Sequence, residues 1–424
     1  MRALGAAVRV GLTRGITRNV VALGIVSLLT DVSSEMLVYL IPLFLANVLL
    51  ASPSIIGVIE GIAESAAALL KLVSGVISDR LRRRRLLVGI GYGSSVASKA
   101  LFLAATSWPI VLVARLGDRI GKGIRTSPRD ALIADSTPPE ARGVAFGLHR
   151  ALDTTGAVVG VAVAAVVVAS SQGSAVVLGA DTFQLLVLVA LVPGVLAVVA
   201  IVVGVHDVPR RAADRAVGEA GPSTRASAVR ARATWRRFPM PFWVFVVASG
   251  LFALGNSSDA FLSLRSQQLG VDVRDLLLII VGFNLANALV SWPVGALSDR
   301  VGRRALVAIA WAIYAAAYAG FALAGSAASV ALLWILYGTY YGVNEAVGRA
   351  LVADLAPTEL RATGYGIVNA VVGLLVLPAS IVAGQLWDRI APSAPFWFGA
   401  GCAAAALLLL VAAVGPARRP EPAF

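Results

Sequence analysis

Long apolar stretches recur along almost the whole chain, and this pattern limits the possible folds more than any other feature. Because the hydrocarbon core of a bilayer is about 30 Å thick, a spanning helix needs roughly 20 mostly apolar residues. Twelve segments meet this requirement, so the sequence predicts an all-α membrane protein with twelve transmembrane helices. The predicted spans are residues 19–48, 54–78, 86–106, 108–136, 141–171, 182–205, 241–267, 273–298, 304–324, 328–355, 361–388 and 394–415.

The composition agrees with a membrane protein and argues against several classes of soluble protein. Hydrophobic residues make up 58% of the chain and charged residues 14%, whereas globular domains contain about 45–50% and roughly 25%. The net charge of +13 would also suit a nucleic-acid-binding protein, but no polar segment is long enough to form the exposed domain that such binding needs. The single cysteine, Cys402, excludes an intrachain disulfide, and the two histidines argue against a metal site, so we expect no cofactor.

One long polar stretch, residues 206–240, is rich in Arg, Ala, Ser and Pro and is predicted to be a linker. It separates an N-terminal half, residues 1–205, from a C-terminal half, residues 241–424, with six predicted spans in each. Arginines gather before the first span, after the second, in the linker, after the eighth span and at the C-terminus. Because basic residues flank spans on the cytoplasmic side, both termini and the linker are expected in the cytoplasm. The first span lacks a small-residue cleavage site and is expected to be retained.

The two halves repeat each other at an offset of about 220 residues. The segment GVISDRLRRRRLL, from Gly75, matches GALSDRVGRRALV, from Gly295, and ALIADSTPPEARGVAFG matches ALVADLAPTELRATGYG. A weaker match aligns the Ser-Ser-Glu triplet that ends at Glu35 with the Ser-Ser-Asp triplet that ends at Asp259. Parallel six-helix repeats are a known transporter plan with the binding site near mid-membrane between them, so the halves are predicted to be pseudo-symmetric.

The repeated loop has the form Gly-x-x-x-Asp-Arg-x-Gly-Arg-Arg and stands between spans two and three and again between spans eight and nine. With this motif, two six-span halves and a basic linker, the chain resembles the major facilitator superfamily over essentially its whole length. The first copy has Arg82 where the turn glycine is usual, and Val161 follows Gly156-x-x-x-Gly160 where drug–proton antiporters typically have proline. The resemblance is to bacterial efflux-type members and implies a secondary active transporter that works by alternating access.

The resemblance also implies that the loop acts as a latch, which holds the two halves closed on the cytoplasmic side. Gly75 would allow close helix approach, Asp79 would cap a neighbouring helix N-terminus, and Arg80 would pair with Asp135. The alternative is a plain helix-ending turn with solvated arginines. The predicted cytoplasmic gate consists of Gly75, Asp79, Arg80 and Asp135 with their counterparts Gly295, Asp299, Arg300 and Asp354.

Charged residues stand inside several predicted spans, although a charge at mid-membrane costs about 2.5–3.5 kcal/mol on insertion scales. Asp31 and Glu35 are one turn apart in the first span, and a basic stripe follows one face of the fourth. In the resembled fold, spans one, four, seven and ten line the central cavity. We predict proton-coupling carboxylates at Asp31, Glu35, Asp259 and Glu64, and a substrate cavity that includes Arg115, Arg119, Lys122, Asn256, Tyr341, Glu345 and Arg349.

Some of these charges have a simpler interpretation. Glu345 and Arg349 are four residues apart and could neutralise each other on one helix face. Glu60 and Glu64 are like charges one turn apart, which disfavours ionisation of both. A structural network nearer the cytoplasmic end is the expected role of His149, Arg150 and Asp153.

Only three of the 36 basic residues are lysines, and all three, Lys71, Lys99 and Lys122, fall within predicted spans. A buried lysine can lose its proton, whereas arginine stays charged. Lys122 therefore becomes a candidate titrating group that faces the cavity. The alternative is that lysine is simply easier to insert or to pack.

The predicted function is transport of a small, anionic solute across the cytoplasmic membrane, coupled to protons, with efflux favoured. No Gly-x-x-x-x-Gly-Lys-Ser/Thr nucleotide site is present, so the energy is expected from an ion gradient. The expected partners are the substrate, the coupling proton and the lipid bilayer, without nucleic acid, and the protein is expected to be a monomer. The alternatives are proton-symport uptake of an organic anion or sugar, and a non-transporting receptor or scaffold; no catalytic constellation suggests an enzyme.

Overall fold

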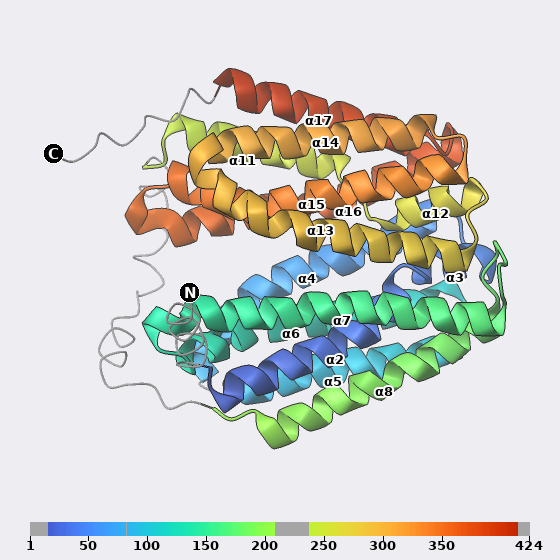
Figure 1. Cartoon of the computed structure of the whole chain (residues 1–424), viewed down its shortest axis with the longest axis horizontal. Helices are drawn as coiled ribbons and strands as arrows, with labels where there is room; N and C mark the ends of the chain where they lie inside the picture. Colours follow the sequence, from blue (N-terminus) through green and yellow to red (C-terminus); the bar gives the residue numbers. More distant parts are fainter. Residues whose placement is uncertain (1–15, 82, 208–236, 414–424) are drawn as a thin grey trace, which may run out of the picture.

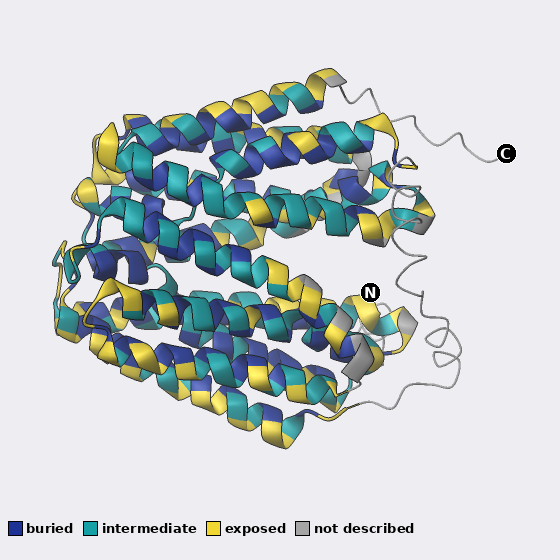
Figure 2. Cartoon of the chain, turned by 180° about the vertical axis from the view of Figure 1, so that it is seen from behind, coloured by how far each residue is buried: buried dark blue, intermediate teal, exposed yellow. Residues whose placement is uncertain are grey.

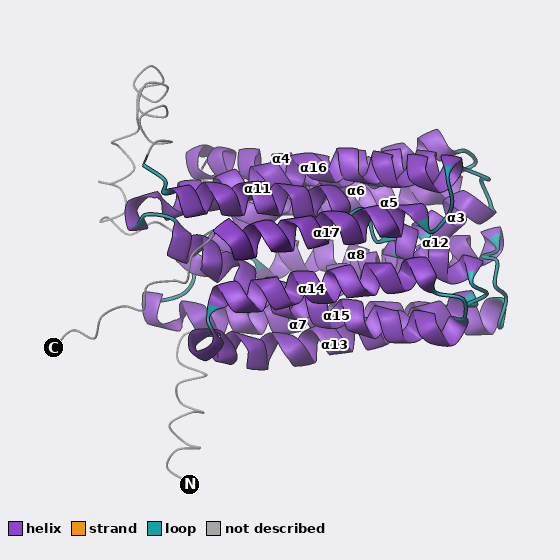
Figure 3. Cartoon of the chain, turned by 90° about the horizontal axis from the view of Figure 1, so that it is seen from above, coloured by secondary structure: helices purple, strands orange, loops and turns teal. Residues whose placement is uncertain are grey.

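The computed structural model describes residues 16–81, 83–207 and 237–413, so most of the predicted linker, residues 206–240, lies outside the described part of the chain. The side chains of Asp79, Arg80, Asp299 and Arg300 are also not described. All elements in the described ranges are helices joined by loops, as Figure 3 shows. A helix satisfies its backbone hydrogen-bonding groups internally, which a bilayer requires of any spanning segment.

The described helices fall into two consecutive sets with the same order of elements (Figure 1). The N-terminal set is α2 (Arg18–Val38), α3 (Ile41–Asn47), α4 (Pro53–Leu81), α5 (Arg84–Ala100), η1 (Leu101–Ala104), α6 (Trp108–Asp135), η2 (Pro139–Ala141), α7 (Arg142–Ser171) and α8 (Ala180–Gly204). The C-terminal set is α11 (Met240–Gly255), α12 (Ala260–Gln268), α13 (Val273–Val301), α14 (Arg303–Leu323), α15 (Ala327–Leu355), η3 (Thr358–Leu360), α16 (Arg361–Arg389) and α17 (Ala394–Ala413).

The packing of the two sets is pseudo-symmetric. In the first half α2 packs against α7 and α8, and in the second α11 packs against α16 and α17. Likewise α4 and α5 pack against α6, as α13 and α14 pack against α15. The halves meet along two helix pairs related by the same symmetry, α4 with α16 and α13 with α7. The predicted twelve-span fold of two six-helix halves is confirmed.

Among the described residues, nine helical segments are long and apolar enough to cross a membrane. The other three long helices, α4, α6 and α15, carry many of the charged and tyrosine residues that line the cavity described below. Large apolar side chains are exposed on the outward faces, for example Val195, Val199 and Val202 on α8. Figure 2 shows such exposed positions along the outer helices. An exposed apolar belt is what a lipid environment requires.

The first helix of each half is interrupted at an equivalent place. Leu40 precedes α3 and Asp259 precedes α12 as the N-cap residue, and the two are 219 positions apart, as are Asp135 and Asp354. In this register Asp259 corresponds to Leu40, so the sequence-based alignment of Asp259 with Glu35 was wrong by five residues. The sequence alignment followed the similar Ser-Ser-Glu and Ser-Ser-Asp triplets. The two halves instead share the position of the helix break, which lies at a different point relative to each triplet.

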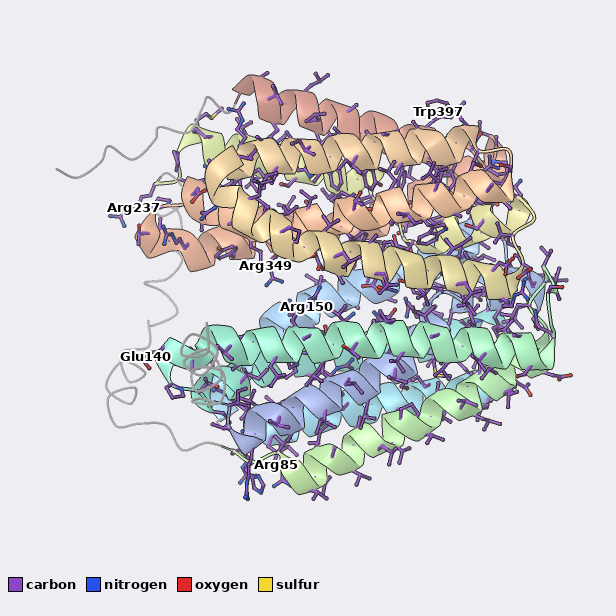
Figure 4. All side chains as sticks on the ribbon, viewed as in Figure 1. Arg85, Glu140, Arg150, Arg237, Arg349 and Trp397 are labelled. Atoms are coloured by element: carbon purple, nitrogen blue, oxygen red, sulfur yellow. The ribbon has the colours of Figure 1, made fainter. Side chains whose placement is uncertain are left out.

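Arginines gather at one end of the bundle, which we call the basic end; Figure 4 labels Arg85 and Arg237 there. Arg84 donates to the Ala131 carbonyl at 3.3 Å and pairs with Asp135. At the equivalent place in the other half, Arg303 pairs with Asp354 at 2.6 Å. The arginines thus bind the last turns of α6 and α15, where free carbonyls and the helix dipole favour a cation.

Candidate functional site

A cavity of about 1070 Å³ lies between the two halves. All eleven residues predicted to couple protons or to contact substrate line it: Asp31, Glu35, Glu64, Arg115, Arg119, Lys122, Asn256, Asp259, Tyr341, Glu345 and Arg349. Further lining residues, such as Lys71 and Tyr365, lie toward the basic end of their helices. The structure therefore brings these candidates together, and their roles remain predictions.

The halves are sealed at the end opposite the basic end. A Cβ added at Gly57 of α4 would lie 2.2 Å from the Ser380 carbonyl oxygen of α16. About two turns further along α4, Ser65 donates to the Gly373 carbonyl of α16 at 3.0 Å. The Gln267 amide of the second half also donates to the Val176 carbonyl of the first at 2.6 Å. Figure 1 shows the helices of the two halves diverging from this seal toward the basic end, and lining residues such as Lys71 and Arg349 lie toward that end of their helices.

Ion pairs in the cavity wall hold α4 and α6 together. Arg115 binds Glu60 through two hydrogen bonds of 2.9 and 2.7 Å, and both residues are buried. Arg119 binds Asp118 at 2.9 Å and Glu64 at 3.1 Å. Such two-pronged guanidinium–carboxylate contacts fix both geometry and charge.

These pairs change the sequence-based interpretation of the basic stripe on α6. Arg115 and Arg119 are neutralised by carboxylates of α4 and α6, so only Lys122 of the stripe lacks a carboxylate within ion-pair distance among the described residues. The argument that Glu60 and Glu64 disfavour each other's ionisation is superseded, because each faces an arginine. Helix spacing alone could not reveal partners on the neighbouring helix.

The three lysines occupy different surroundings. Lys99 is buried outside the cavity lining and donates to the hydroxyls of Ser33 and Ser34 at 2.8 and 2.9 Å. It thereby ties α5 to α2 just before Glu35. Lys71 and Lys122, in contrast, line the cavity.

A pair of carboxyl groups from α2 and α7 lines the cavity. Asp31 of α2 and Asp153 of α7 both line it, and Ser27 donates to the Asp153 carboxylate at 2.7 Å. The close approach of the helices comes from Gly156, where a Cβ would lie 2.5 Å from the Leu28 carbonyl oxygen.

Asp259 lies in the aromatic wall of the second half. Tyr337 donates to it at 2.6 Å, and the Tyr341 hydroxyl is 3.4 Å from its other oxygen. The break between α11 and α12 places Asn256 and Asp259 at the cavity surface. Unwound backbone of this kind is tolerated at membrane depth where it lines a cavity.

Sequence reasoning missed most of the aromatic surface around Asp259. Phe245 and Phe252 of α11, Phe283 of α13 and Trp311 of α14 also line the cavity. No sequence signal separates them from core aromatics, because both occur in apolar helices. They give the second half an aromatic wall opposite the charged wall of the first half.

The predicted pairing of Glu345 with Arg349 was wrong. The Glu345 carboxylate pairs instead with Arg150, which belongs to α7 of the other half and also lies 3.4 Å from Asp153. Arg349 has no ion pair with a described side chain and is exposed in the cavity. Figure 4 shows Arg150 and Arg349 entering the space between the halves from opposite sides.

The predicted gate is only partly covered by the described side chains. Asp135 and Asp354 are bound by Arg84 and Arg303 in equivalent positions. The side chains of Asp79, Arg80, Asp299 and Arg300 lie outside the described part, so the predicted Arg80–Asp135 pair stays a prediction. The close approach of α4 and α6 occurs at Gly123, where a Cβ would lie 2.7 Å from Leu70, rather than at Gly75, where the nearest atoms are at an ordinary 3.6 Å.

Searches against known proteins place this arrangement among transporters. A family model, the Major Facilitator Superfamily, matches residues 23–369 and 259–424. The uncharacterized MFS-type transporter MJ1317 of Methanocaldococcus jannaschii is 34% identical over 404 residues, which cover 94% of this chain and 95% of that protein. The uncharacterized protein Rv2265 of Mycobacterium tuberculosis is 28% identical over 387 residues, or 90% of each chain. The crystal structure of the nucleoside transporter NupG shares the fold, with a TM-score of 0.72 and 14% identity over 93% of this chain and 99% of that one.

Proposed function

Because this chain belongs to the major facilitator superfamily, a family of membrane transporters, we propose that it exports a small anionic solute across the cytoplasmic membrane in exchange for protons. The basic end faces the cytoplasm in this proposal, since positive residues favour that side. The cavity then opens to the cytoplasm and alternates by rocking of the two halves. Export is favoured by the general resemblance of the chain to bacterial efflux members, and no single residue decides the direction.

The observation that carries proton coupling is the carboxyl pair of Asp31 and Asp153 at the cavity surface. Asp31 has no ion pair with a described side chain, whereas Asp153 lies 3.4 Å from Arg150, so a change in hydration or in the position of Arg150 would change how readily the pair binds a proton. Glu35 and Asp259 also line the cavity without an ion pair to a described side chain. These carboxyl groups can take up protons that enter from the opposite side after the halves have rocked.

The test is transport in proteoliposomes with an imposed pH gradient and a panel of neutral, cationic and anionic solutes. In the wild-type protein, protons that flow down their gradient should drive an anionic solute in the opposite direction. Asp31→Asn should reduce this solute flux at least tenfold. The matched control is Asp181→Asn, because Asp181 is exposed in the first turn of α8 and away from the cavity. The control should keep the wild-type flux.

Each alternative function predicts a different result in the same assay. A proton symporter would move solute and protons in the same direction, and this result would mean that the protein takes up its solute. A receptor or scaffold would show binding without pH-driven flux of any solute. Equal flux in wild type and Asp31→Asn would remove the carboxyl pair from the coupling mechanism.

A further inference from the structure

Most cations that line the cavity already have a partner. Arg115 and Arg119 pair with carboxylates as described above, Arg129 pairs with Asp130 at 2.9 Å, and Arg150 pairs with Glu345. Arg125 donates to Ser95 and lies over the Tyr92 ring. Within the described part of the chain, the cavity cations whose side chains make no hydrogen bond or ion pair are Lys71, Lys122 and Arg349.

Those three cations line the same cavity although they come from both halves. Helices α4 and α6 are bound together beside Lys71 and Lys122, because Ser74 donates to the Gly123 carbonyl at 2.9 Å and Ser127 to the Lys71 carbonyl at 2.7 Å. Arg349 projects from α15 of the second half (Figure 4). We call Lys71, Lys122 and Arg349 the cationic triad.

Among the described residues, no carboxylate lies within ion-pair distance of a triad side chain. All three side chains are exposed to the cavity. Two cavity carboxylates, Asp130 and Glu64, already pair with Arg129 and Arg119. Like charges that face a confined space repel, and an anion between them removes that repulsion. Other carboxyls also line the cavity, from α2, α4, α7, α15 and the residue before α12: Asp31, Glu35, Glu60, Asp153, Glu345 and Asp259.

We propose that the cationic triad binds a compact headgroup with two negative charges, a phosphate monoester or a dicarboxylate, of an organic solute whose body is aromatic or apolar. Arg349 offers a planar fork and the two lysines offer point charges, a combination suited to such a headgroup. The body would lie against Phe252, Tyr340 and Phe283 of the second half, which line the same cavity. The proposal rests on the proposed transport function and names its substrate class.

The division of the triad between the halves links binding to movement. Two members belong to α4 and α6 and one to α15, so a bound dianion attracts the halves toward each other at the basic end. Without the anion, the repulsion among the three cations favours the open basic end. Substrate binding therefore supplies the differential interaction that a conformational change requires.

The experiment measures binding to the purified full-length protein in detergent by isothermal titration calorimetry, without a pH gradient. The probes are phenyl phosphate and phthalate as aromatic dianions, benzoate as a monoanion and benzyl alcohol as a neutral analogue. The dianions should bind at least tenfold more tightly than benzoate, and increasing salt should weaken them most. Lys71→Gln, Lys122→Gln and Arg349→Gln should each weaken dianion binding at least tenfold.

Two controls keep the result interpretable. Arg389→Gln removes an exposed arginine at the opposite end and should bind like wild type. Lys122→Arg keeps the positive charge and should keep dianion binding within a few fold of wild type. If Lys122 had only a structural role, the longer and differently shaped arginine would not be expected to restore binding. Any Gln variant that does not elute as a monodisperse protein is replaced by the corresponding Met variant, which keeps the side-chain length.

The outcomes separate this proposal from the transport function. Equal binding of dianion, monoanion and neutral probes, no dianion binding, or unchanged binding in the Gln variants would overturn the triad as a dianion site. If the dianions bind as expected but no pH-driven flux is found, the coupling proposal fails and the site stands. If pH-driven flux is found only for neutral or cationic solutes, the transporter stands and the dianion site fails.

Discussion

The contact between α4 and α16 predicts that adding one methyl group at Gly57 will shift the protein away from the conformation seen here. The added Cβ of Gly57→Ala would lie 2.2 Å from the Ser380 carbonyl oxygen and 3.2 Å from Phe261. Carbon contacts are favourable at about 3.5–4.0 Å, so the two helices would have to separate by about 1 Å. The obstacle is backbone, which cannot rotate away as a side chain can.

The magnitude follows from what differs between the two conformations. Overpacking of this kind costs about 1–3 kcal/mol. The gain of about 1 kcal/mol in helix propensity from Gly to Ala applies in both conformations and cancels. The clash exists only while the end opposite the basic end is closed. An equilibrium shift of about 1–3 kcal/mol, or roughly 5–150-fold, toward the conformation closed at the basic end is therefore expected.

The assay is a distance measurement between spin labels at the basic end. Glu140→Cys and Thr358→Cys place labels on exposed positions of the two halves, in a Cys402→Ala background that removes the native thiol. Figure 4 shows Glu140 at this end. Gly57→Ala should move population from the long to the short distance in double electron–electron resonance.

Gly366→Ala is the matched control, because Gly366 lies on α16 and a Cβ there meets nothing within 4 Å. It should leave the distance distribution of the wild type. The reasoning would be refuted if Gly57→Ala gave the wild-type distribution, or if both glycine variants gave the same shift.

Three further predictions concern the charged groups. Arg115→Gln should lower the free energy of unfolding by about 3–5 kcal/mol, because Glu60 is left as an unpaired buried charge. In thermal unfolding, the double variant Glu60→Gln/Arg115→Gln should recover part of this loss. If the losses of the two single variants simply added in the double variant, the pairing would be contradicted. Arg150→Gln should cost only about 0–1 kcal/mol in the same measurement, since the side chains of Arg150 and Glu345 are 58% and 43% exposed; a larger loss would mean that this pair holds the halves together. Lys122→Arg should change the pH profile of transport if Lys122 titrates during the cycle, and an unchanged profile would show that its deprotonation is not required.

The fold could be predicted almost completely from the sequence, because a bilayer leaves few alternatives. A spanning segment must be helical and about 20 residues long, and the repeat then pairs the halves. Even the grouping of Asp31, Glu35, Asp259 and Arg349 around one cavity follows from the pattern of charged residues. The helix breaks before Ala260 and Ile41 were not predicted, because each falls inside one long predicted span, 241–267 and 19–48.

The partners of the charged groups could not be predicted with the same success. Spacing along one helix suggested Glu345 with Arg349, yet Arg150 from α7 is the partner. The two pairings have similar chemistry, and only the distance between α7 and α15 decides between them. For the same reason the sequence could not distinguish Arg115, held by Glu60, from Lys122, which is left for other uses.

Several described arginines at the basic end bind carbonyls inside their own half. Arg142 donates to the Ala134 carbonyl at 3.3 Å in the first half, and Arg361 to the Ala353 carbonyl at 3.1 Å in the second. None of these bonds needs to break when the halves rock, so each half can move as a rigid body. The contacts that change during the cycle then lie at the interface between the halves, where glycines and a few polar contacts separate at little cost in free energy. Random substitutions should accordingly slow the cycle more often along that interface than at the arginine-rich end.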